Sequence, residues 1–234
     1  MKTALVTGAS RGIGLAIAKA IAPSVDNLII VAKHQETLDK AALKIEGTKL
    51  TKMVANLEDE KEILRLVRDI NKELDHLDIL VNNAGVYIGK RFGKSSLEEI
   101  NRMINLDLAA YIVLTHQLLP LLKKGTNPQI INVSSWATSV QLFGEAVYSA
   151  TKAGVSAFSN VLRKELNSEN IKVTSIEPGG VDTYEVPRPD VLINPDDIGE
   201  LVRYIISCPP ALQIDTVGLT HIRQWRGDRP GWIE

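Results

Sequence analysis

The sequence predicts an α/β fold, in which one doubly wound parallel sheet of about seven strands carries helices on both faces within a single domain. Short apolar runs alternate along the chain with stretches of helical periodicity, which is typical of strand and helix units in alternation. The runs are apolar at consecutive positions, as expected for strands that are buried on both faces. The 234 residues, 44% of them hydrophobic, suit one compact domain with a full core.

Seven apolar runs are candidate strands. In chain order they are TALVTG (3–8), NLIIVA (27–32), LTKMVA (50–55), LDILVNN (77–83), QIINVSS (129–135), KVTSIEP (172–178) and VGLTHI (217–222).

The segments between these runs predict helices. The pattern LAIAKAIA (15–22) predicts a helix directly after the first run. The clearest helix follows the third run, where Asn56 and Asp59 have the spacing of a capping pair. Its apolar positions recur at helical spacing, at Ile63, Leu64, Leu66, Val67, Ile70 and Leu74.

Prolines interrupt the periodicity after the sixth run. The stretch YEVPRPDVLINPDD (184–197) contains three prolines and predicts a loop, followed by a helix from about Asp197 to Ser207. No linker or repeat precedes it, so one domain is expected over residues 1–234, with a short loop at about 184–194.

Composition argues against several classes of protein. The net charge is -1 and the 24% of charged residues form no long run, so neither nucleic acid nor an anionic membrane is an expected partner. Cys208 is the only cysteine, so no internal disulfide is possible. The N-terminus lacks a signal-peptide pattern and no apolar stretch reaches membrane-spanning length, which predicts a cytoplasmic protein. The histidines are too far apart for a local metal motif, at His34, His76, His116 and His221.

A glycine-rich turn follows the first strand. In TGASRGIG (7–14), Gly8, Gly12 and Gly14 lie between the strand and the next helix. Glycine allows a sharp turn and lets phosphates approach the amides of a helix N-terminus, where the helix dipole favours negative charge. The spacing is not the common G-x-G-x-x-G, so on these residues alone a plain strand-to-helix turn remains the alternative.

Further strings decide between these readings. NNAG (82–85) follows the fourth strand, Ser135 follows the fifth, and YSATK (148–152) begins thirteen residues after that serine. With them the sequence resembles the short-chain dehydrogenase/reductase family, whose members of this size are single Rossmann domains. The resemblance runs from Thr3 to about Val217 and includes Asn105 and PGGVDT (178–183). It implies hydride transfer between a nicotinamide and a small carbonyl or hydroxy compound.

Tyr148 and Lys152 are four residues apart, so a helix places them side by side. A phenol ionises near pH ~10, and an adjacent ammonium group lowers its pKa, as an acid/base near neutrality requires. Tyr148 is therefore the expected proton donor and acceptor, and Ser135 is the expected partner that polarises the substrate oxygen, with Ser134 as the alternative. The resemblance implies that Lys152 also binds the nicotinamide ribose, and that Asn105, at a helix bulge, holds a proton relay.

The resemblance also implies a cofactor site. Asn82 would stabilise the centre of the sheet, and Val181 and Thr183 would bind the nicotinamide carboxamide so that the pro-S side of the ring meets the substrate. At the position of Asn56 the family often has an aspartate, whose side chain binds the adenine amino group. Asn56 could make the same contact, or it could cap the following helix instead. The expected cofactor-binding residues are Gly8, Ser10, Arg11, Gly12, Ile13, Gly14, Lys33, Asn56, Leu57, Asn83, Ala84, Gly85, Tyr148, Lys152, Pro178, Gly179, Val181 and Thr183.

The end of the second strand favours NADP(H) over NAD(H). A site for NAD places an acid there to bind the ribose 2′-hydroxyl, but this chain has Ala32, followed by Lys33. Ala32 leaves space for a 2′-phosphate, and Lys33 with Arg11 supplies positive charge. Solvated surface charges are the alternative reading of the two cations.

The substrate is less well defined. Trp136, Leu142, Phe143 and Tyr184 are candidate pocket walls, and the short loop at 184–194 predicts a small substrate. The C-terminal part is weakly similar to NADP-dependent 3-hydroxy acid dehydrogenases, in which case Arg188 would meet a carboxylate. Sugars, diketones, aldehydes and 3-oxoacyl thioesters remain open.

The helix after Asn105 bears on assembly. The resemblance implies a dimer or tetramer built through the helices that carry Asn105 and Tyr148. The helix is apolar around much of its surface, which fits burial on two sides, at Leu106, Leu108, Tyr111, Ile112 and Leu118. A homo-oligomer is therefore expected, a tetramer first and a dimer as the alternative. Two other functions remain open. One is a dinucleotide-binding regulator without turnover, and the other is an enzyme that uses a bound nicotinamide internally.

Overall fold

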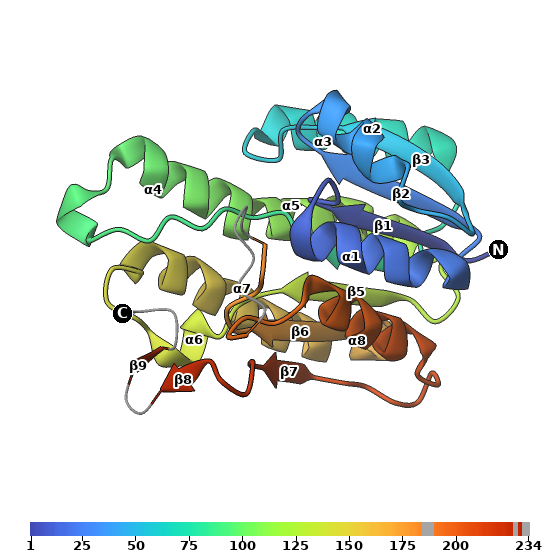
Figure 1. Ribbon diagram of the computed structural model, residues 1–234. Helices are drawn as coiled ribbons and strands as arrows, with labels where there is room; N and C mark the ends of the chain where they lie inside the picture. The colour runs from blue at the N-terminus through green and yellow to red at the C-terminus, as the bar shows by residue number, and fades with distance from the viewer. Residues whose placement is uncertain (184–189, 227–228, 231–234) are drawn as a thin grey trace.

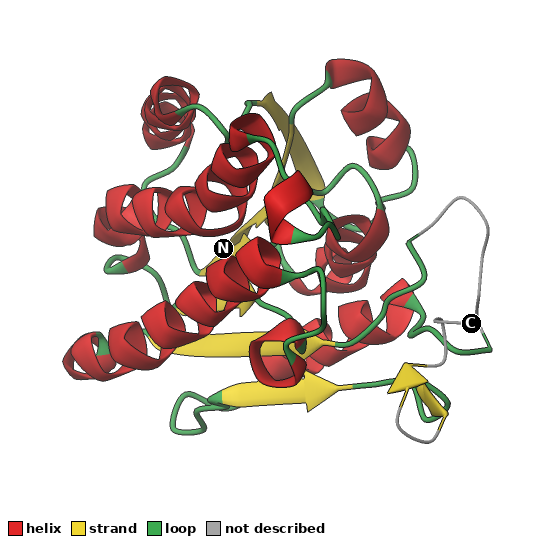
Figure 2. Ribbon diagram, turned by 90° about the vertical axis from the view of Figure 1, so that its left-hand side faces the viewer, coloured by secondary structure: helices red, strands yellow, loops and turns green. Residues whose placement is uncertain are grey.

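The computed structural model describes residues 1–183, 190–226 and 229–230. Its centre is a sheet of seven strands in the order β3-β2-β1-β4-β5-β6-β7, with every neighbouring pair parallel (Figures 1 and 2). The strands are β1 (Thr3–Thr7), β2 (Asn27–Ala32), β3 (Lys49–Val54), β4 (Ile79–Asn82), β5 (Gln129–Val133), β6 (Lys172–Pro178) and β7 (Thr216–Leu219). A separate antiparallel pair joins β8 (Trp225–Arg226) to β9 (Arg229–Pro230).

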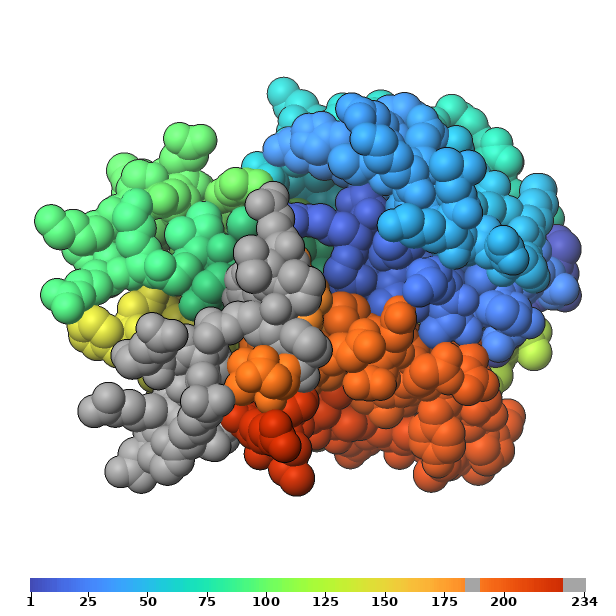
Figure 3. Space-filling model, viewed as in Figure 1, coloured from blue at the N-terminus to red at the C-terminus, as the bar shows by residue number. Residues whose placement is uncertain are grey.

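Helices cover both faces of the sheet, as Figure 2 shows. Side chains of α1, α2 and α8 pack in one core cluster, and those of α3, α5 and α7 pack in the other. On the face seen in Figure 3, the orange segment of α8 lies against the blue N-terminal segments, and the green segment around α4 projects to one side. The helices are α1 (Gly12–Ile21), α2 (Gln35–Ala42), α3 (Glu60–Glu73), α4 (Leu97–Ile104), α5 (Ala110–Leu122), α6 (Ala137–Val140), α7 (Ala146–Glu165) and α8 (Pro195–Ser207).

The consecutive apolar residues of each strand supply both clusters. In β1, Val6 belongs to the cluster under α1 and α8, whereas its neighbour Leu5 belongs to the cluster under α3 and α5. Ile30 and Ile29 of β2 divide in the same way. Successive strand residues point to opposite faces, so a sheet with helices on both sides needs apolar residues at every position. The predicted fold class is confirmed.

The order of the strands also positions the site. The chain runs outward from β1 through β2 to β3, and then returns to the other side of β1 with β4. Parallel α/β sheets bind ligands beyond the carboxyl ends of the strands, where the strand order reverses. Here that point lies between β1 and β4.

Two helix starts differ from the predictions. The N-cap of α3 is Asp59, whose carboxylate accepts the Lys61 N–H, whereas Asn56 lies in the preceding turn and accepts the Glu58 N–H. The expected capping pair of Asn56 and Asp59 is therefore wrong, because Asp59 itself satisfies an amide of the first helical turn. Helix α8 begins at Pro195, two residues earlier than expected, since proline suits the first position of a helix and Asn194 caps it.

Helices α4 and α5 form one helical region, Leu97–Leu122, joined by a π-helical turn at Asn105–Ala109. The bulge that the resemblance implied at Asn105 is thus present. By length and composition this region is long and apolar enough to cross a membrane, so the expectation that no apolar stretch has this length is wrong. The apolar residues of this helical region contribute to the core of the domain, because Leu114 and Leu118 are buried in the core cluster.

Candidate active site

The glycine-rich turn is tightly packed. Gly8 and Gly12 have φ of 66° and 54°, a region that favours glycine. Gly14 leaves no room for a side chain, because a Cβ there would collide with the Gly8 carbonyl oxygen and the Asn83 side-chain amide. The turn therefore brings backbone against backbone at the N-terminus of α1, where amide groups and the helix dipole can hold a phosphate. This cradle, which a Cβ would fill, fits a dinucleotide.

Replacing Gly14 by alanine should disturb both folding and cofactor binding. The added methyl group must push Gly8 and Asn83 apart, and overpacking of this kind costs about 1–3 kcal/mol. The melting temperature and the affinity for NADPH, followed by the fluorescence of the bound cofactor, should both fall. Gly93→Ala is the matched control, since a Cβ at Gly93 meets no atom of the described residues within 4 Å. Equal behaviour of the two variants would contradict this account of the turn.

The NNAG string is held against the end of β1. The Thr7 Oγ accepts the N–H of Asn83 at 2.9 Å and that of Ala84 at 3.1 Å. Asn83 returns a bond from Nδ2 to the Thr7 carbonyl oxygen at 2.9 Å. These bonds place the turn after β4 beside the glycine-rich turn, so the two predicted cofactor-binding segments meet at the point where the strand order reverses.

Asn82 lies at the centre of the sheet, as the resemblance implied. It is 1% exposed, and its Nδ2 donates to Asn132 Oδ1 at 2.8 Å and to Thr115 Oγ1 at 3.0 Å. The side chain thereby links β4, β5 and α5 and has a scaffold role.

Tyr148 and Lys152 lie one turn apart on α7. The Lys152 Nζ is 5.9 Å from the centroid of the Tyr148 ring and donates to the Val133 carbonyl oxygen at 3.1 Å. Lys152 is only 4% exposed, and burial lowers the pKa of its ammonium group, while the charge of Asp107 raises it. Tyr87 packs its ring edge-on against Tyr148, with 5.0 Å between centroids.

The two serines after β5 have different surroundings. The Ser134 Oγ donates to the Lys152 carbonyl oxygen at 2.9 Å and lies 2.8 Å from Ser156 Oγ, so Ser134 ties β5 to α7. The Ser135 Oγ accepts the Ala137 N–H at 3.1 Å and donates its own proton to no group in the described part of the chain. This difference favours Ser135 over Ser134 as a donor to a bound molecule.

Asn105 is exposed at the start of the π-helical turn, and its backbone carbonyl accepts the Ala110 N–H. The side chain that the structure brings to Lys152 from this turn is that of Asp107, with Oδ1 at 3.9 Å from Nζ. Sequence reasoning missed Asp107. Its signal is an acid two residues after Asn105, at the entrance to an otherwise apolar helix.

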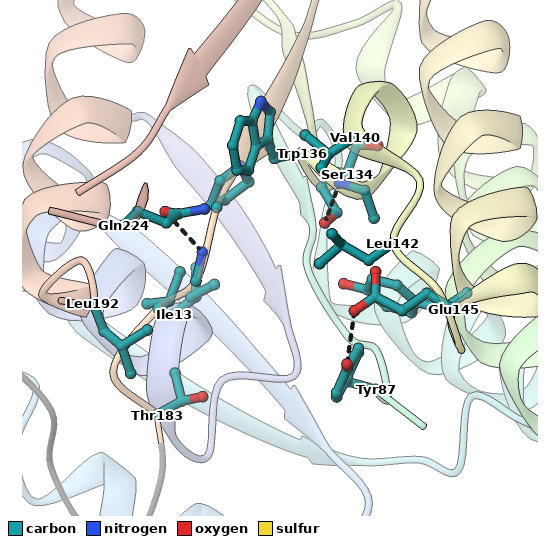
Figure 4. A pocket seen from close by; sticks show the side chains of 17 residues that line it. Ile13, Tyr87, Ser134, Trp136, Val140, Leu142, Glu145, Thr183, Leu192 and Gln224 are labelled. Carbon is teal, nitrogen blue, oxygen red and sulfur yellow. Dashed lines mark hydrogen bonds between the residues drawn. The ribbon is translucent and has the colours of Figure 1, made fainter. Parts of the chain in front are cut away.

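A cavity of about 320 Å³ lies beside Ser135 and Tyr148. In Figure 4, one wall carries Ile13, Thr183, Leu192 and Gln224, and the opposite wall carries Tyr87, Val140, Leu142 and Glu145. Ile13 comes from the glycine-rich turn and Thr183 from the segment after β6, so these two of the predicted cofactor-binding segments reach the cavity. Pro178, Gly179 and Val181 also line it.

The predicted pocket walls are partly correct. Trp136 and Leu142 line the cavity, but Phe143 does not, because its side chain is 84% exposed and lies under the Arg91 guanidinium group. Tyr184 and Arg188 lie outside the described residues. Three polar members of the cavity were not among the predicted walls: Tyr87, Glu145 and Gln224. Of these, Glu145 lies in the segment WATSVQLFGEAV (136–147), which was expected to contact the substrate.

These polar side chains are held in place. The Glu145 carboxylate accepts the Tyr87 hydroxyl at 2.7 Å, and Gln224 Oε1 accepts the Gly180 N–H at 3.3 Å (Figure 4). Glu145 is three residues before Tyr148, at the N-terminus of α7. The cavity therefore combines apolar walls with one carboxylate close to the predicted acid/base.

The predicted 2′-phosphate side of the cofactor site lies at the end of β2. The Ala9 N–H bonds the Val31 carbonyl oxygen at 3.1 Å, which brings the glycine-rich turn beside this strand end. Lys33 is exposed, and its Nζ lies 3.3 Å from a Glu58 oxygen that also accepts from Arg102. Arg11 is exposed at the N-cap of α1.

The other predicted cofactor contacts differ in how exposed they are. Leu57 is buried in the core and offers a ligand only its backbone, whereas Asn56 is partly exposed. Ser10 is partly exposed in the glycine-rich turn. Gly85 is exposed, and a Cβ there would collide with the Asp107 carboxylate.

Comparison with known proteins identifies the class. A family model described as short chain dehydrogenase matches residues 2–187. The chain belongs to the short-chain dehydrogenase/reductase family and is an oxidoreductase of that family.

Individual relatives agree with this assignment. The chain is 35% identical over 218 residues to a fatty acyl-CoA reductase of Acinetobacter baylyi. The matched region covers 89% of this chain and 74% of the relative. Its fold matches an alcohol dehydrogenase of Thermococcus sibiricus complexed with 5-hydroxy-NADP, with a TM-score of 0.89 and 26% identity over 97% of this chain and 99% of that one. It also matches a serine dehydrogenase complexed with NADP+, with a TM-score of 0.84 and 27% identity over 97% and 98% of the two chains.

Proposed function

We propose that this protein is an NADP(H)-dependent oxidoreductase that interconverts a small carbonyl compound and its alcohol, with Tyr148 as the acid/base. One observation carries the proposal. Ser135 and Tyr148, from the end of β5 and from α7, line the same cavity as Ile13 of the glycine-rich turn and Thr183 of the segment after β6, both predicted cofactor contacts. A substrate in this cavity would meet a proton donor and a hydrogen-bond donor at once.

The roles of the residues follow from their chemistry. The nicotinamide, when bound, supplies or accepts the hydride. The Ser135 hydroxyl donates to the substrate oxygen and polarises the carbonyl, and the Tyr148 hydroxyl gives that oxygen its proton as negative charge develops there. The positive charge of Lys152 favours the ionised phenol and so lowers the free energy of proton release. In the alcohol oxidation these proton movements are reversed.

Preference for NADP(H) is part of the proposal. Ala32 places no carboxylate where the 2′-phosphate would lie, and Lys33 and Arg11 are the cations that would hold it. Two structural relatives were solved with NADP or an NADP derivative, which supports the preference. Glu58 weakens the argument for NADP(H), because its carboxylate already pairs with Lys33 and offsets the positive charge that would hold the 2′-phosphate.

The substrate is proposed to be small and without a carboxylate near the reacting carbon. The cavity of about 320 Å³ suits a small molecule, and the Glu145 carboxylate in its wall would repel an acid. This argues against 3-hydroxy acids, the substrate class suggested by the C-terminal sequence. The single domain over residues 1–234 and the short substrate loop at about 184–194 remain part of the proposal, and residues 184–189 of that loop lie outside the described residues.

Glu145→Gln tests this substrate class. Loss of about 1 kcal/mol of charge repulsion should raise kcat/KM for a 3-oxo acid roughly 5-fold. The methyl ester of the same acid is the control, and its kcat/KM should change much less because it carries no charge. A 3-oxo acid that the unmodified enzyme already turns over as well as its ester would contradict the proposed class.

The assembly is proposed to be a homo-oligomer. Ile104 and Ile112 are 40% and 39% exposed on the helical region of α4 and α5, and burial of this side by a second copy would remove apolar surface from water. Dimer against tetramer, and the cytoplasmic location, stay predictions.

The test of the proposed function is turnover. NADPH should be oxidised in the presence of small aldehydes or ketones, and Tyr148→Phe should remove that activity. NADPH binding without turnover of any carbonyl compound would favour a regulator instead.

A further inference from the structure

Asp107 is a buried carboxylate that the proposed chemistry does not use. It lies in the π-helical turn between α4 and α5 and is 0% exposed. Its Oδ1 accepts the Val86 N–H at 2.8 Å and lies 3.9 Å from the Lys152 Nζ. Its Oδ2 is buried and has no hydrogen-bond partner in the described part of the chain. Burying a charged group destabilises the fold unless the charge is paired, so a buried carboxylate at this position must be stabilised by a partner.

The charged and titratable groups around Asp107 come from several elements. Lys152 faces it from α7, and Arg102 acts on it from α4, where Arg102 also pairs with Glu58. Tyr111, on α5, has its pKa raised by burial and by the charge of Asp107, with Tyr148 adding to the effect. Within the residues that the structure describes, Asp107 is the one carboxylate within ion-pair distance of Lys152.

Lys152 needs such a partner. Its Nζ is buried, and the hydrogen bond that it donates goes to the neutral Val133 carbonyl. Tyr111 and Tyr148 present their rings at 5.3 and 5.9 Å, which adds weak attraction for a cation. Without the charge of Asp107, burial would favour the neutral amine, and a neutral amine gives no support to an ionised Tyr148.

We propose that Asp107 is a positioning residue that keeps Lys152 protonated and in place, and that it acts through Lys152 on the proton transfer at Tyr148. The same carboxylate holds the Val86 N–H, so one side chain couples the segment after NNAG to the predicted catalytic helix. This inference rests on the proposed function for its effect on turnover, whereas the coupling between Asp107 and Lys152 is independent of it.

The pKa of Asp107 sets the range over which the coupling operates. Burial raises this pKa to about 6, against the opposing effects of Lys152, the Val86 N–H and Arg102. Asp107 is therefore ionised and paired above pH 6, and it loses its charge as the pH falls through 6. At higher pH its charge raises the pKa of Lys152 and so delays loss of the lysine proton.

The first test is Asp107→Asn in the full chain, which keeps the size of the side chain and an oxygen for the Val86 N–H. The Lys152 Cε resonance, in protein labelled with ¹³C-lysine and assigned with Lys152→Met, should titrate at least about one pH unit lower in the variant than in the unmodified protein. An unchanged midpoint would overturn the proposal, whatever the enzyme's activity. In the unmodified protein the same resonance should also sense a step near pH 6, which tests the coupling even if the variant fails to fold.

The second test is the pH profile of alcohol oxidation with NADP⁺. The rate rises with pH as Tyr148 ionises, and a lysine that has lost its charge no longer assists this ionisation. In Asp107→Asn the rising limb should therefore move to more alkaline pH, with at least about a 10-fold loss of kcat near neutrality. A limb that moves to lower pH would mean that Lys152 kept its charge, and a uniform loss at all pH values would mean a purely structural role; either result overturns the proposal.

Asp78→Asn is the matched control. Asp78 is 1% exposed and its two oxygens accept the Thr3 N–H at 2.7 Å and the Thr126 N–H at 2.6 Å, but it precedes β4, at the end of the strand opposite to NNAG. It should lose stability without moving the Lys152 midpoint or the pH profile. Should Tyr148→Phe retain activity while the Lys152 midpoint still depends on Asp107, the proposed function would fail and the coupling would stand.

Discussion

Tyr148→Phe is expected to lower kcat by roughly 10²- to 10⁴-fold, because the substitution removes the hydroxyl that exchanges the proton with the substrate oxygen. The phenyl ring remains, so the edge-on contact with Tyr87 and the cavity wall should be kept. NADPH affinity should accordingly change by no more than about 2-fold. Steady-state turnover and a fluorescence titration with NADPH, on the same preparation, measure the two effects separately.

Tyr87→Phe is the matched control for this experiment. It also removes one phenol hydroxyl from the same cavity, but that hydroxyl pairs with Glu145. Its kcat should therefore fall much less. If Tyr148→Phe kept most of its activity, or if the two variants lost the same amount, Tyr148 would not be the acid/base.

Ala32→Asp is expected to reverse the cofactor preference. Ala32 is 6% exposed at the end of β2, beside the glycine-rich turn, and a carboxylate there would repel a 2′-phosphate. We expect kcat/KM for NADPH to fall roughly 100-fold, about 3 kcal/mol, while the value for NADH holds or rises because a carboxylate can bind the 2′-hydroxyl.

NADH is the internal control in this variant, since it differs from NADPH only in the 2′-phosphate. Equal losses with both cofactors would indicate damage to the fold rather than a change of specificity. Unchanged use of NADPH would show that the phosphate does not lie beside position 32.

The fold was predictable because its signals are local. The order of apolar runs and helical patterns defines strands and helices, and consecutive apolar residues such as Leu5 and Val6 require helices on both faces of the sheet. Helix boundaries were less predictable, because several residues compete to cap the same turn. Asp59 rather than Asn56 caps α3 for this reason.

The candidate site was predictable where its residues lie in motifs. The spacing of Tyr148 and Lys152 on one helix is visible in the sequence, and the bulge at Asn105 was implied by the resemblance to the family. The contact between Asp107 and Lys152 was not, because it joins residues 45 positions apart that only the tertiary fold brings together. Glu145 and Gln224 became members of the cavity in the same way, since their roles depend on where α7 and the segment after β7 pack.

The most direct test of the central claim is the oxidation of NADPH and of NADH by the full chain, followed at the nicotinamide absorbance. The panel should contain small ketones, diketones, aldehydes, a sugar, 3-oxo acids with their methyl esters, and an acyl thioester. The account predicts turnover of small uncharged carbonyl compounds with NADPH preferred over NADH. Tight binding of NADPH with no oxidation by any member of the panel would contradict it.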